Sequence, residues 1–161
     1  MQSFWRRSRR RFRTLVRISW KDRALLVESL VMLAAARLMV ITTRRQQLVS
    51  RIGGTRIDGA ELPETPGRPR AGRPVTVSAR IGVSVERMAR FTWWRSMCLE
   101  KALAGRWMLR RRGIPSTMYV GMARQGEQFV AHAWLVGEGQ TLTGAAKMPY
   151  AALAVFREPG A

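Results

Sequence analysis

The sequence predicts an α+β fold in which helices come first and a small antiparallel sheet comes last. Three observations support this prediction. Apolar segments of helical length fill much of the first 52 residues, a segment rich in glycine and proline follows, and the chain after residue 75 passes from helical patterns to short β-type runs. Hydrophobic residues make up 47% of the 161 residues, which is enough to bury a core.

Residues 1–52 are expected to form an N-terminal helical region. It would consist of a basic leader, a long apolar helix from about Lys21 to Thr42, and a shorter helix through Gln47 and Ile52.

Two charges inside the long helix, Glu28 and Arg37, bear on membrane insertion. They lie nine residues apart and do not share one polar stripe. A membrane-spanning helix needs about 20 residues nearly free of charge, and more than twenty residues of charged chain precede this apolar stretch, which also argues against a signal peptide. We therefore expect a largely buried helix in a cytoplasmic protein, with weak contact to a membrane surface as the alternative.

The next two parts of the chain differ sharply in composition. Residues 53–74 contain five glycines and four prolines, which break any helix or strand periodicity, so we expect a linker or extended loop there. Residues 75–161 are expected to be the compact α+β unit, and the chain shows no internal repeat.

Two helices are predicted at the start of that unit. The first covers about 77–91, and the second about 97–112. Ser96 is the candidate N-cap of the second helix, and Gly113 is the candidate residue that ends it before Pro115. The three arginines at 110–112 complement the negative end of the helix dipole.

Three β runs follow, over Ser116–Arg124, Gln128–Val136 and Gln140–Gly144. Gly137-Glu138-Gly139 is the expected turn between the second and third runs. If Val136 pairs with Gln140 across that turn, His132 faces Gly144.

Cys98 and His132, the chain's single cysteine and single histidine, are the candidate catalytic residues. Cys98 lies where the second helix of the unit starts, and the unpaired N–H groups and positive dipole end there favour a thiolate, as does nearby Arg95. A thiol facing an imidazole on a neighbouring strand is what a cysteine hydrolase needs, because the imidazole takes the thiol proton and helix-end N–H groups hold the oxyanion. Spacing and composition alone favour structural roles for both residues over this dyad.

The net charge of +19 suggests an anionic partner such as nucleic acid, a membrane surface or an acidic peptide. Arginine-rich tracts at 6–13 and 110–112, with Trp5 and Trp107 nearby, make a non-enzymatic binder of nucleic acid or anionic surfaces the alternative function. The sequence carries no nucleic-acid recognition signature, so this alternative ranks below an enzyme. One cysteine and one histidine exclude multi-thiolate zinc sites and His-rich metal sites, and no nucleotide-binding glycine motif is present.

Several motifs between Trp94 and Trp134 occur in a distinctive order. Trp-Arg-x-x-Cys-Leu enters a helix, Arg-Arg-Arg-Gly-Ile-Pro closes it, and a β run with Gly121 and a His-Ala-Trp strand follow. This region resembles the transglutaminase-like cysteine proteases of lasso-peptide biosynthesis, the leader-removing B proteins. The upstream apolar helix and the C-terminal tail also resemble that family, through Glu28, Leu30, Tyr150, Leu153 and Phe156.

The resemblance implies a papain/transglutaminase-like core, in which a helix bearing Cys98 packs on a small antiparallel sheet bearing His132. It implies a cysteine peptidase that removes the leader peptide from a ribosomally made lasso-peptide precursor before macrolactam formation. Cys98 would be the nucleophile and His132 the general base and later the general acid, without a metal, nucleotide or redox cofactor. The same pair would also suit a transglutaminase-type acyl transferase, and the sequence leaves that option open.

The resemblance also implies partners. The precursor peptide is the substrate, and a separate ATP-dependent cyclase would use the freed amine. Residues 1–74 lack the period-2 strands of a leader-recognition module, so we expect a separate leader-recognition protein.

The chain departs from the family where a triad needs its third member. The family has an Asp about a dozen residues beyond the histidine, but this sequence has no Asp after Asp58, and Gly144 occupies the expected position. Glu138 and Gln140 lie too far along the strand to replace it. Thr143, or a backbone carbonyl near Gly144, could hold the imidazole more weakly. We therefore expect a Cys–His dyad whose third group the sequence does not identify.

Overall fold

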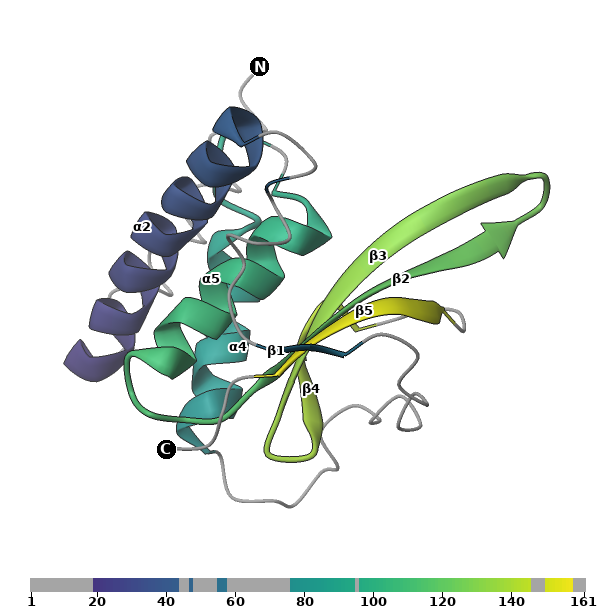
Figure 1. Cartoon of the computed structure of the whole chain (residues 1–161). Helices are drawn as coiled ribbons and strands as arrows, with labels where there is room; N and C mark the ends of the chain where they lie inside the picture. The colour runs from purple at the N-terminus through teal and green to yellow at the C-terminus, as the bar shows by residue number, and fades with distance from the viewer. Residues whose placement is uncertain are drawn as a thin grey trace.

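The computed structural model describes residues 19–43, 47, 55–57, 76–94, 96–145 and 150–157. Its helices and strands are α2 (Trp20–Thr42), β1 (Thr55–Ile57), α4 (Val77–Met88), α5 (Cys98–Arg110), β2 (Thr117–Gln125), β3 (Gln128–Gly137), β4 (Gln140–Thr143) and β5 (Ala151–Arg157). The fold is α+β, as predicted, with the helices on one side of a single antiparallel sheet and the β2–β3 hairpin extending beyond the other strands (Figure 1). The basic leader, and the short helix predicted through Ile52 apart from Gln47, lie outside the described residues.

The three helices and the sheet share one hydrophobic core. The helix α5 packs on β3 and β4, and α2 packs on α4 and α5 rather than on the sheet. Buried side chains from every layer meet in one cluster, among them Leu33, Val85, Leu103, Leu135 and Phe156. The N-terminal helix is therefore part of the same core as the sheet.

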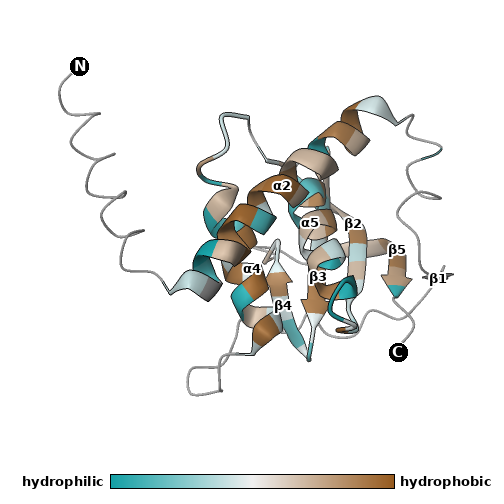
Figure 2. Ribbon diagram, turned by 90° about the vertical axis from the view of Figure 1, so that its left-hand side faces the viewer, coloured by the Kyte–Doolittle hydropathy of each residue, from teal (hydrophilic) through white to brown (hydrophobic). Residues whose placement is uncertain are grey.

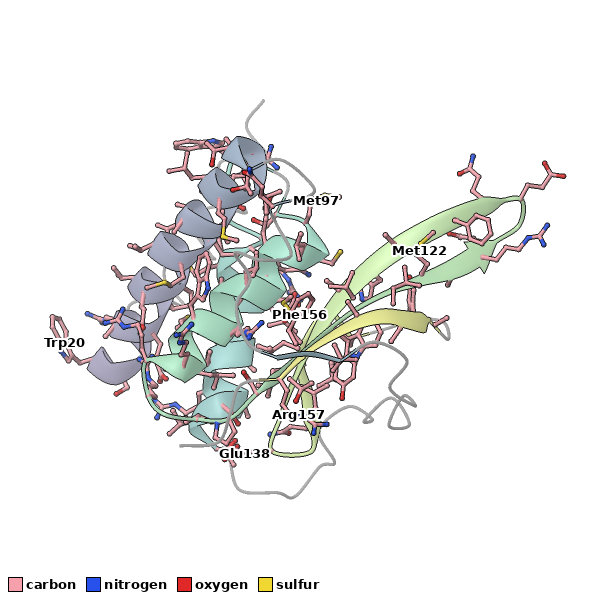
Figure 3. The ribbon with its side chains drawn as sticks, in the orientation of Figure 1. Trp20, Met97, Met122, Glu138, Phe156 and Arg157 are labelled. Atoms are coloured by element: carbon pink, nitrogen blue, oxygen red, sulfur yellow. The ribbon has the colours of Figure 1, made fainter. Side chains whose placement is uncertain are left out.

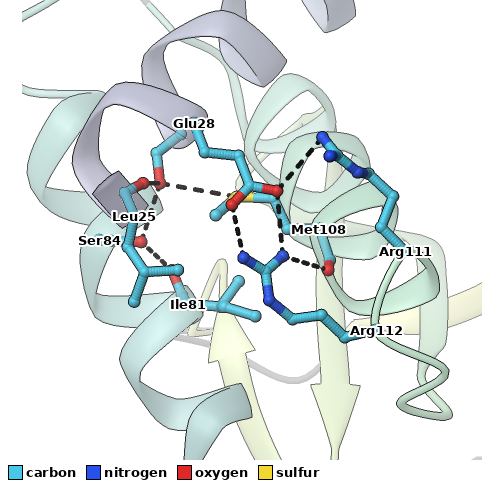
Figure 4. A network of polar contacts seen from close by, with 8 residues as sticks. Leu25, Glu28, Ile81, Ser84, Met108, Arg111 and Arg112 are labelled. Atoms are coloured by element: carbon cyan, nitrogen blue, oxygen red, sulfur yellow. Dashed lines mark hydrogen bonds and ion pairs between the residues drawn. The ribbon is translucent and has the colours of Figure 1, made fainter. Parts of the chain in front are cut away.

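Ion pairs connect α2 to the two ends of α5. Near the N-terminus of α5, Arg37 Nη1 lies 2.9 Å from Glu100 Oε1. Near its C-terminus, Arg112 Nη2 lies 2.6 Å from Glu28 Oε2, and the hydrogen bond from Arg112 holds the pKa of Glu28 below its ordinary value (Figure 4). The two charges that the sequence places on different stripes of α2 thus each have a partner at a different end of α5.

A small polar contact lies buried where the three helices meet. Ser29 Oγ and Ser84 Oγ are 2.8 Å apart, and they lie within hydrogen-bond distance of the carbonyl oxygens of Leu25 and Ile81 respectively (Figure 4). Each hydroxyl has a protein partner, so its burial carries no penalty for an unsatisfied polar group.

The expectation of a largely buried α2 is wrong. Leu25, Leu33 and Ala36 face the core, but a row of large apolar side chains is exposed because α4 and α5 cover only one side of the helix; it comprises Trp20, Val27, Leu30, Val31, Leu38 and Ile41. Hydrophobic residues run along much of α2 (Figure 2), and Trp20 projects from its start (Figure 3). By length and composition alone, Asp22–Thr42 could cross a membrane, a test that core helices and signal sequences also pass.

The turn between β3 and β4 is one residue shorter than predicted. Gly137 pairs with Gln140, and the two turn residues, Glu138 and Gly139, have φ of 50° and 70°. Two positive φ values are typical of a tight two-residue turn whose twist matches that of the strands. A bulge then shifts the register, so that Leu135 pairs with Thr143.

Two strands were not predicted. Residues 55–57 lie within the segment expected to be a linker or loop, yet they form β1 and pair with β5. The strand β5 in turn pairs with β2, which places it between β1 and β2 in the sheet order β1-β5-β2-β3-β4. A β-bulge between Val120 and Gly121 interrupts this second pairing.

The ends of α5 confirm one predicted cap and correct the other. Gly113, with φ of 63°, ends the helix: its N–H bonds to Arg110 O and the next N–H, of Ile114, bonds to Leu109 O. Met97, not Ser96, precedes the first helical residue. The Ser96 hydroxyl instead lies 2.9 Å from the Thr92 hydroxyl.

The burial of α2 gives a first prediction. Leu33 is 0% exposed and Leu38 on the same helix is 59% exposed. We expect Leu33→Ala to lower the free energy of unfolding by about 2–5 kcal/mol, because it removes a core side chain and leaves a cavity. The matched control Leu38→Ala should change it by less than about 0.5 kcal/mol. Urea unfolding of both variants measures the difference, and equal losses would show that α2 does not pack on this core.

Candidate active site

Cys98 is the first residue of α5, at the end of the helix where N–H groups lack intrahelical partners. The preceding residue, Met97, marks this end in Figure 3. Its N–H donates to Glu100 Oε2 at 3.1 Å, and the Glu100 side chain is fully buried. This bond fixes the first turn and leaves the N–H of Cys98 without an intrahelical partner at the helix end.

His132 lies on β3, and its side chain hydrogen-bonds to the Cys98 thiol. The structure therefore brings together the two residues that the sequence singles out, although 34 positions separate them along the chain. Cys98 is half-buried at the edge of the main core, where the end of α5 meets the sheet.

The surroundings of Cys98 favour the thiolate. Burial raises the pKa of the thiol, but hydrogen bonds from the His132 side chain and from the N–H groups of Ala133 and Leu99 lower it, as does the charge of the imidazole. The lowering effects win, so the pKa of Cys98 lies below its ordinary value. A thiolate is the form of cysteine that acts as a nucleophile.

The backbone carbonyl of Gly144 holds the imidazole of His132 from the other side. His132 Nε2 lies 2.8 Å from Gly144 O. A carbonyl oxygen only accepts, so Nε2 carries a proton and Nδ1 is left to exchange a proton with the thiol. The hydrogen bond to Cys98 raises the pKa of His132, and so does the bond to the Gly144 carbonyl. Burial and the positive charge of Lys101 lower the pKa. The raising effects are larger, so the pKa of His132 lies above its ordinary value.

Two aromatic rings flank the imidazole. Tyr150 stacks on His132 with 4.7 Å between ring centroids, and Trp134 stacks with 6.1 Å between centroids. Trp134 in turn stacks on Tyr119, which is buried. Trp134 lies two residues after His132 on β3 and so shares its face of the strand. Tyr150 precedes β5, and the sequence marked it only as part of the C-terminal tail that resembles the family. These rings restrict rotation of the imidazole.

Gly144 occupies a position that only glycine fits. Its φ is 69°, and a Cβ atom built there would lie 2.4 Å from Ala133 O. The close approach to β3 is what brings the Gly144 carbonyl within reach of the His132 ring. The predicted pairing of residue 144 with His132 is not present in the sheet, yet the Gly144 carbonyl still lies beside the His132 ring.

The other three candidates for the third group have different roles. The Glu138 carboxylate accepts a hydrogen bond from Ser78 Oγ beside the start of α4 (Figure 3), and this bond lowers its pKa. Gln140 Nε2 lies 3.5 Å from Thr76 Oγ1 in the same region. Thr143 is buried in the core, and its hydroxyl has no hydrogen-bond partner within the described part of the chain. The carbonyl of Gly144 is therefore the group that meets His132.

Two charged residues near the site were missed. Glu86 on α4 accepts a hydrogen bond from the Gly144 N–H, and Lys101 on α5 forms an ion pair with Glu86. Both had only the general pattern of a charged residue on a predicted helix, so no sequence signal separated them from solvated side chains. Within the described residues, no three His, Cys, Asp or Glu side chains gather in a way that could hold a metal ion.

Comparison with known proteins gives one match. A model of the transglutaminase-like superfamily matches residues 30–157, which include the C-terminal part of α2, Cys98, His132 and β5. Neither the curated proteins nor the solved structures contain a match to the chain.

The hydrogen bond between the two central side chains gives a second prediction. We expect His132→Ala to move the pH midpoint of Cys98 alkylation by iodoacetamide upward, because the burial that raises the thiol pKa remains while the bond that lowers it is lost. The rate of Cys98 alkylation at neutral pH should therefore fall. Cys98 is the only cysteine, so mass spectrometry of the intact protein reports this one thiol. An unchanged midpoint in the folded variant would contradict the observed pairing.

The carbonyl that holds His132 gives a third prediction, with a glycine at the far hairpin turn as control. Gly126 has φ of 62° and open space around it, whereas a Cβ on Gly144 meets backbone atoms. Gly126→Ala should cost about 1–2 kcal/mol of unfolding free energy, the effect of a left-handed backbone alone, and should leave Cys98 alkylation unchanged. Gly144→Ala should cost more and should also slow alkylation. Equal behaviour of the two variants would refute a role for the Gly144 carbonyl.

Proposed function

Because this chain belongs to the transglutaminase-like superfamily, we propose that it is a cysteine peptidase that removes the leader peptide from a lasso-peptide precursor. The superfamily includes cysteine peptidases and acyltransferases, and its fold is typically that of an enzyme with a catalytic cysteine. The observation that carries the proposal is the Cys98 thiol at a helix N-terminus, hydrogen-bonded to His132. The ordered motifs from Trp94 to Trp134, which resemble the leader-removing B proteins, support the choice of substrate.

The first chemical step forms a thioester. The imidazole of His132 takes the thiol proton, and the Cys98 sulfur attacks the carbonyl carbon of the bond between leader and core. The Cys98 N–H, which has no intrahelical partner at the start of α5, would stabilise the negative oxygen of the tetrahedral intermediate. His132 then gives its proton to the leaving nitrogen, so the C–N bond breaks and the core peptide departs with a free amine.

The second step regenerates the enzyme. His132 takes a proton from a water molecule, whose oxygen attacks the thioester carbon. The C–S bond breaks, the leader leaves with a new carboxylate, and the proton returns to the Cys98 sulfur. These steps use only the two side chains, backbone N–H groups and water. The free amine of the core is the group that a separate ATP-dependent cyclase would join to an internal carboxylate.

The leader is proposed to arrive bound to a separate recognition protein in the cytoplasm. We assign the exposed apolar residues of α2 as the surface that binds the recognition protein. Side chains such as Val27 and Val31 are exposed to solvent there, and exposed apolar patches of this kind are typical of protein-binding sites. A groove of about 700 Å³ lies along the same surface, between Trp20, Met32 and Arg111. The weak membrane-surface contact considered from the sequence would use these same residues of α2.

Two other functions make different predictions. An acyl transferase would form the same thioester but pass the acyl group to an amine instead of water. A binder of nucleic acid would need its basic tracts free, yet Arg111 and Arg112 are within ion-pair distance of Glu28. The tract at 6–13 lies outside the described residues. The engaged arginines favour the enzyme.

The fourth prediction tests the proposed reaction directly. Wild-type protein mixed with a candidate precursor and the recognition partner should release leader and core, and mass spectrometry should show a gain of one water. Cys98→Ala should abolish release while keeping the unfolding free energy close to that of wild type, because the thiol adds little packing. Full activity without the partner would remove the need for separate recognition. Release by Cys98→Ala at the wild-type rate would exclude the peptidase, and an amine-linked product would identify an acyl transferase.

A further inference from the structure

We infer that Glu86 is a positioning residue that does through Gly144 what the missing triad carboxylate would do directly. This inference rests on the proposed function, since it concerns how the Cys98–His132 pair is held for catalysis. In a complete triad the third group accepts a hydrogen bond from the histidine, fixing its tautomer and orientation. Here the backbone carbonyl of Gly144 accepts that bond, so the groups that hold Gly144 in place also hold the imidazole.

A hydrogen bond from the N–H of the same glycine holds its carbonyl in place. The Gly144 N–H donates to Glu86 Oε1 at 3.1 Å, while the Gly144 carbonyl accepts from His132 Nε2 at 2.8 Å. Gly144 follows the last residue of β4 and is not paired as part of the sheet. Its N–H would otherwise lack a partner in a buried position, so Glu86 both satisfies the donor and fixes the residue.

An ion pair with Lys101 in turn holds Glu86. Lys101 Nζ lies 3.1 Å from both carboxylate oxygens of Glu86. Lys101 is three residues after Cys98 on α5, so it stands one turn above the nucleophile. The side chains of Lys101 and Glu86 are 20% and 32% exposed, and a pair held at two oxygens in this partly buried setting has a defined geometry. The pair thus links α4, α5 and the segment after β4.

Glu86 also affects the balance of charge around the His132 imidazole. Besides Trp134, the groups around His132 are the Cys98 thiol, the Gly144 carbonyl, Tyr150 and the Lys101 ammonium. The positive charge of Lys101 lowers the pKa of His132 and so opposes the imidazolium. Glu86 lies against that ammonium and offsets its charge. One carboxylate therefore fixes the carbonyl that holds the ring and also protects the protonated form of the ring.

The fifth prediction separates these two effects with two substitutions at one position. Glu86→Ala removes the acceptor for the Gly144 N–H, and we expect Cys98 alkylation at neutral pH to slow about three- to tenfold, the fold-change that one net hydrogen bond represents. Glu86→Gln keeps an oxygen that can accept from the same N–H, so alkylation should stay within about twofold of wild type. Glu86→Gln also removes the negative charge beside Lys101, so the midpoint of the His132 titration, measured by NMR, should move to lower pH. In Glu86→Gln/Lys101→Gln that shift should disappear.

Glu28→Gln is the control for stability. It removes a carboxylate from another ion pair between helices, far along α5 from Cys98. It should lower the melting temperature without changing the alkylation profile or the histidine titration. If Glu86→Ala behaves in the same way, Glu86 is only structural and the inference is overturned. If Glu86→Ala does not fold, an unchanged histidine titration in Glu86→Gln overturns it equally.

The measurements need no substrate, which separates this inference from the proposed function. Failure of wild-type protein to cleave any precursor would overturn the peptidase, while slowed alkylation in Glu86→Ala would still establish the positioning role. Where precursor cleavage is observed, kcat should fall in Glu86→Ala with KM little changed, and Glu86→Gln should recover most of it.

Discussion

The hydrogen bond from the Met97 N–H to Glu100 is the interaction on which the rest of this structure depends. Glu100 is fully buried, and its second oxygen bonds to Arg37 from α2. A buried carboxylate without such partners would be strongly destabilising, so the start of α5 and the position of α2 stabilise each other. Because Cys98 is the first helical residue, this arrangement decides where the thiol stands and which N–H groups remain free beside it.

The His132 imidazole is held by a neutral backbone carbonyl, whereas a complete triad holds it with a carboxylate. A backbone carbonyl brings no negative charge, so it orients His132 without the full electrostatic support that a carboxylate gives to an imidazolium. A thiol needs less help than a hydroxyl because it is more acidic, and the N–H groups around Cys98 already lower its pKa. The ion pair between Lys101 and Glu86 holds the carboxylate that binds the Gly144 N–H, and so it fixes the position of that carbonyl indirectly.

The sequence predicted those parts of the fold that depend on local pattern. Gly113 ends α5 because a left-handed residue is needed there, and glycine is the residue that takes it without strain. The strand β5 escaped prediction because its inward and outward positions do not alternate regularly, with three buried residues in succession from Ala154 to Phe156. The contact between Glu86 and Gly144 joins residues 58 positions apart, and no local pattern records such a distance.

The sequence by itself determined that a lone cysteine lies at the start of a helix, that a lone histidine lies on a strand, and that no aspartate follows to complete a triad. These are properties of residue type and order, which periodicity and motif spacing reveal. Only the tertiary structure decided what replaces the aspartate. The close approach of Gly144 to β3 sets the direction of its carbonyl, and the packing of α4 and α5 sets where Glu86 and Lys101 meet it, because hydrogen bonds depend on distances in space that the order of residues does not contain.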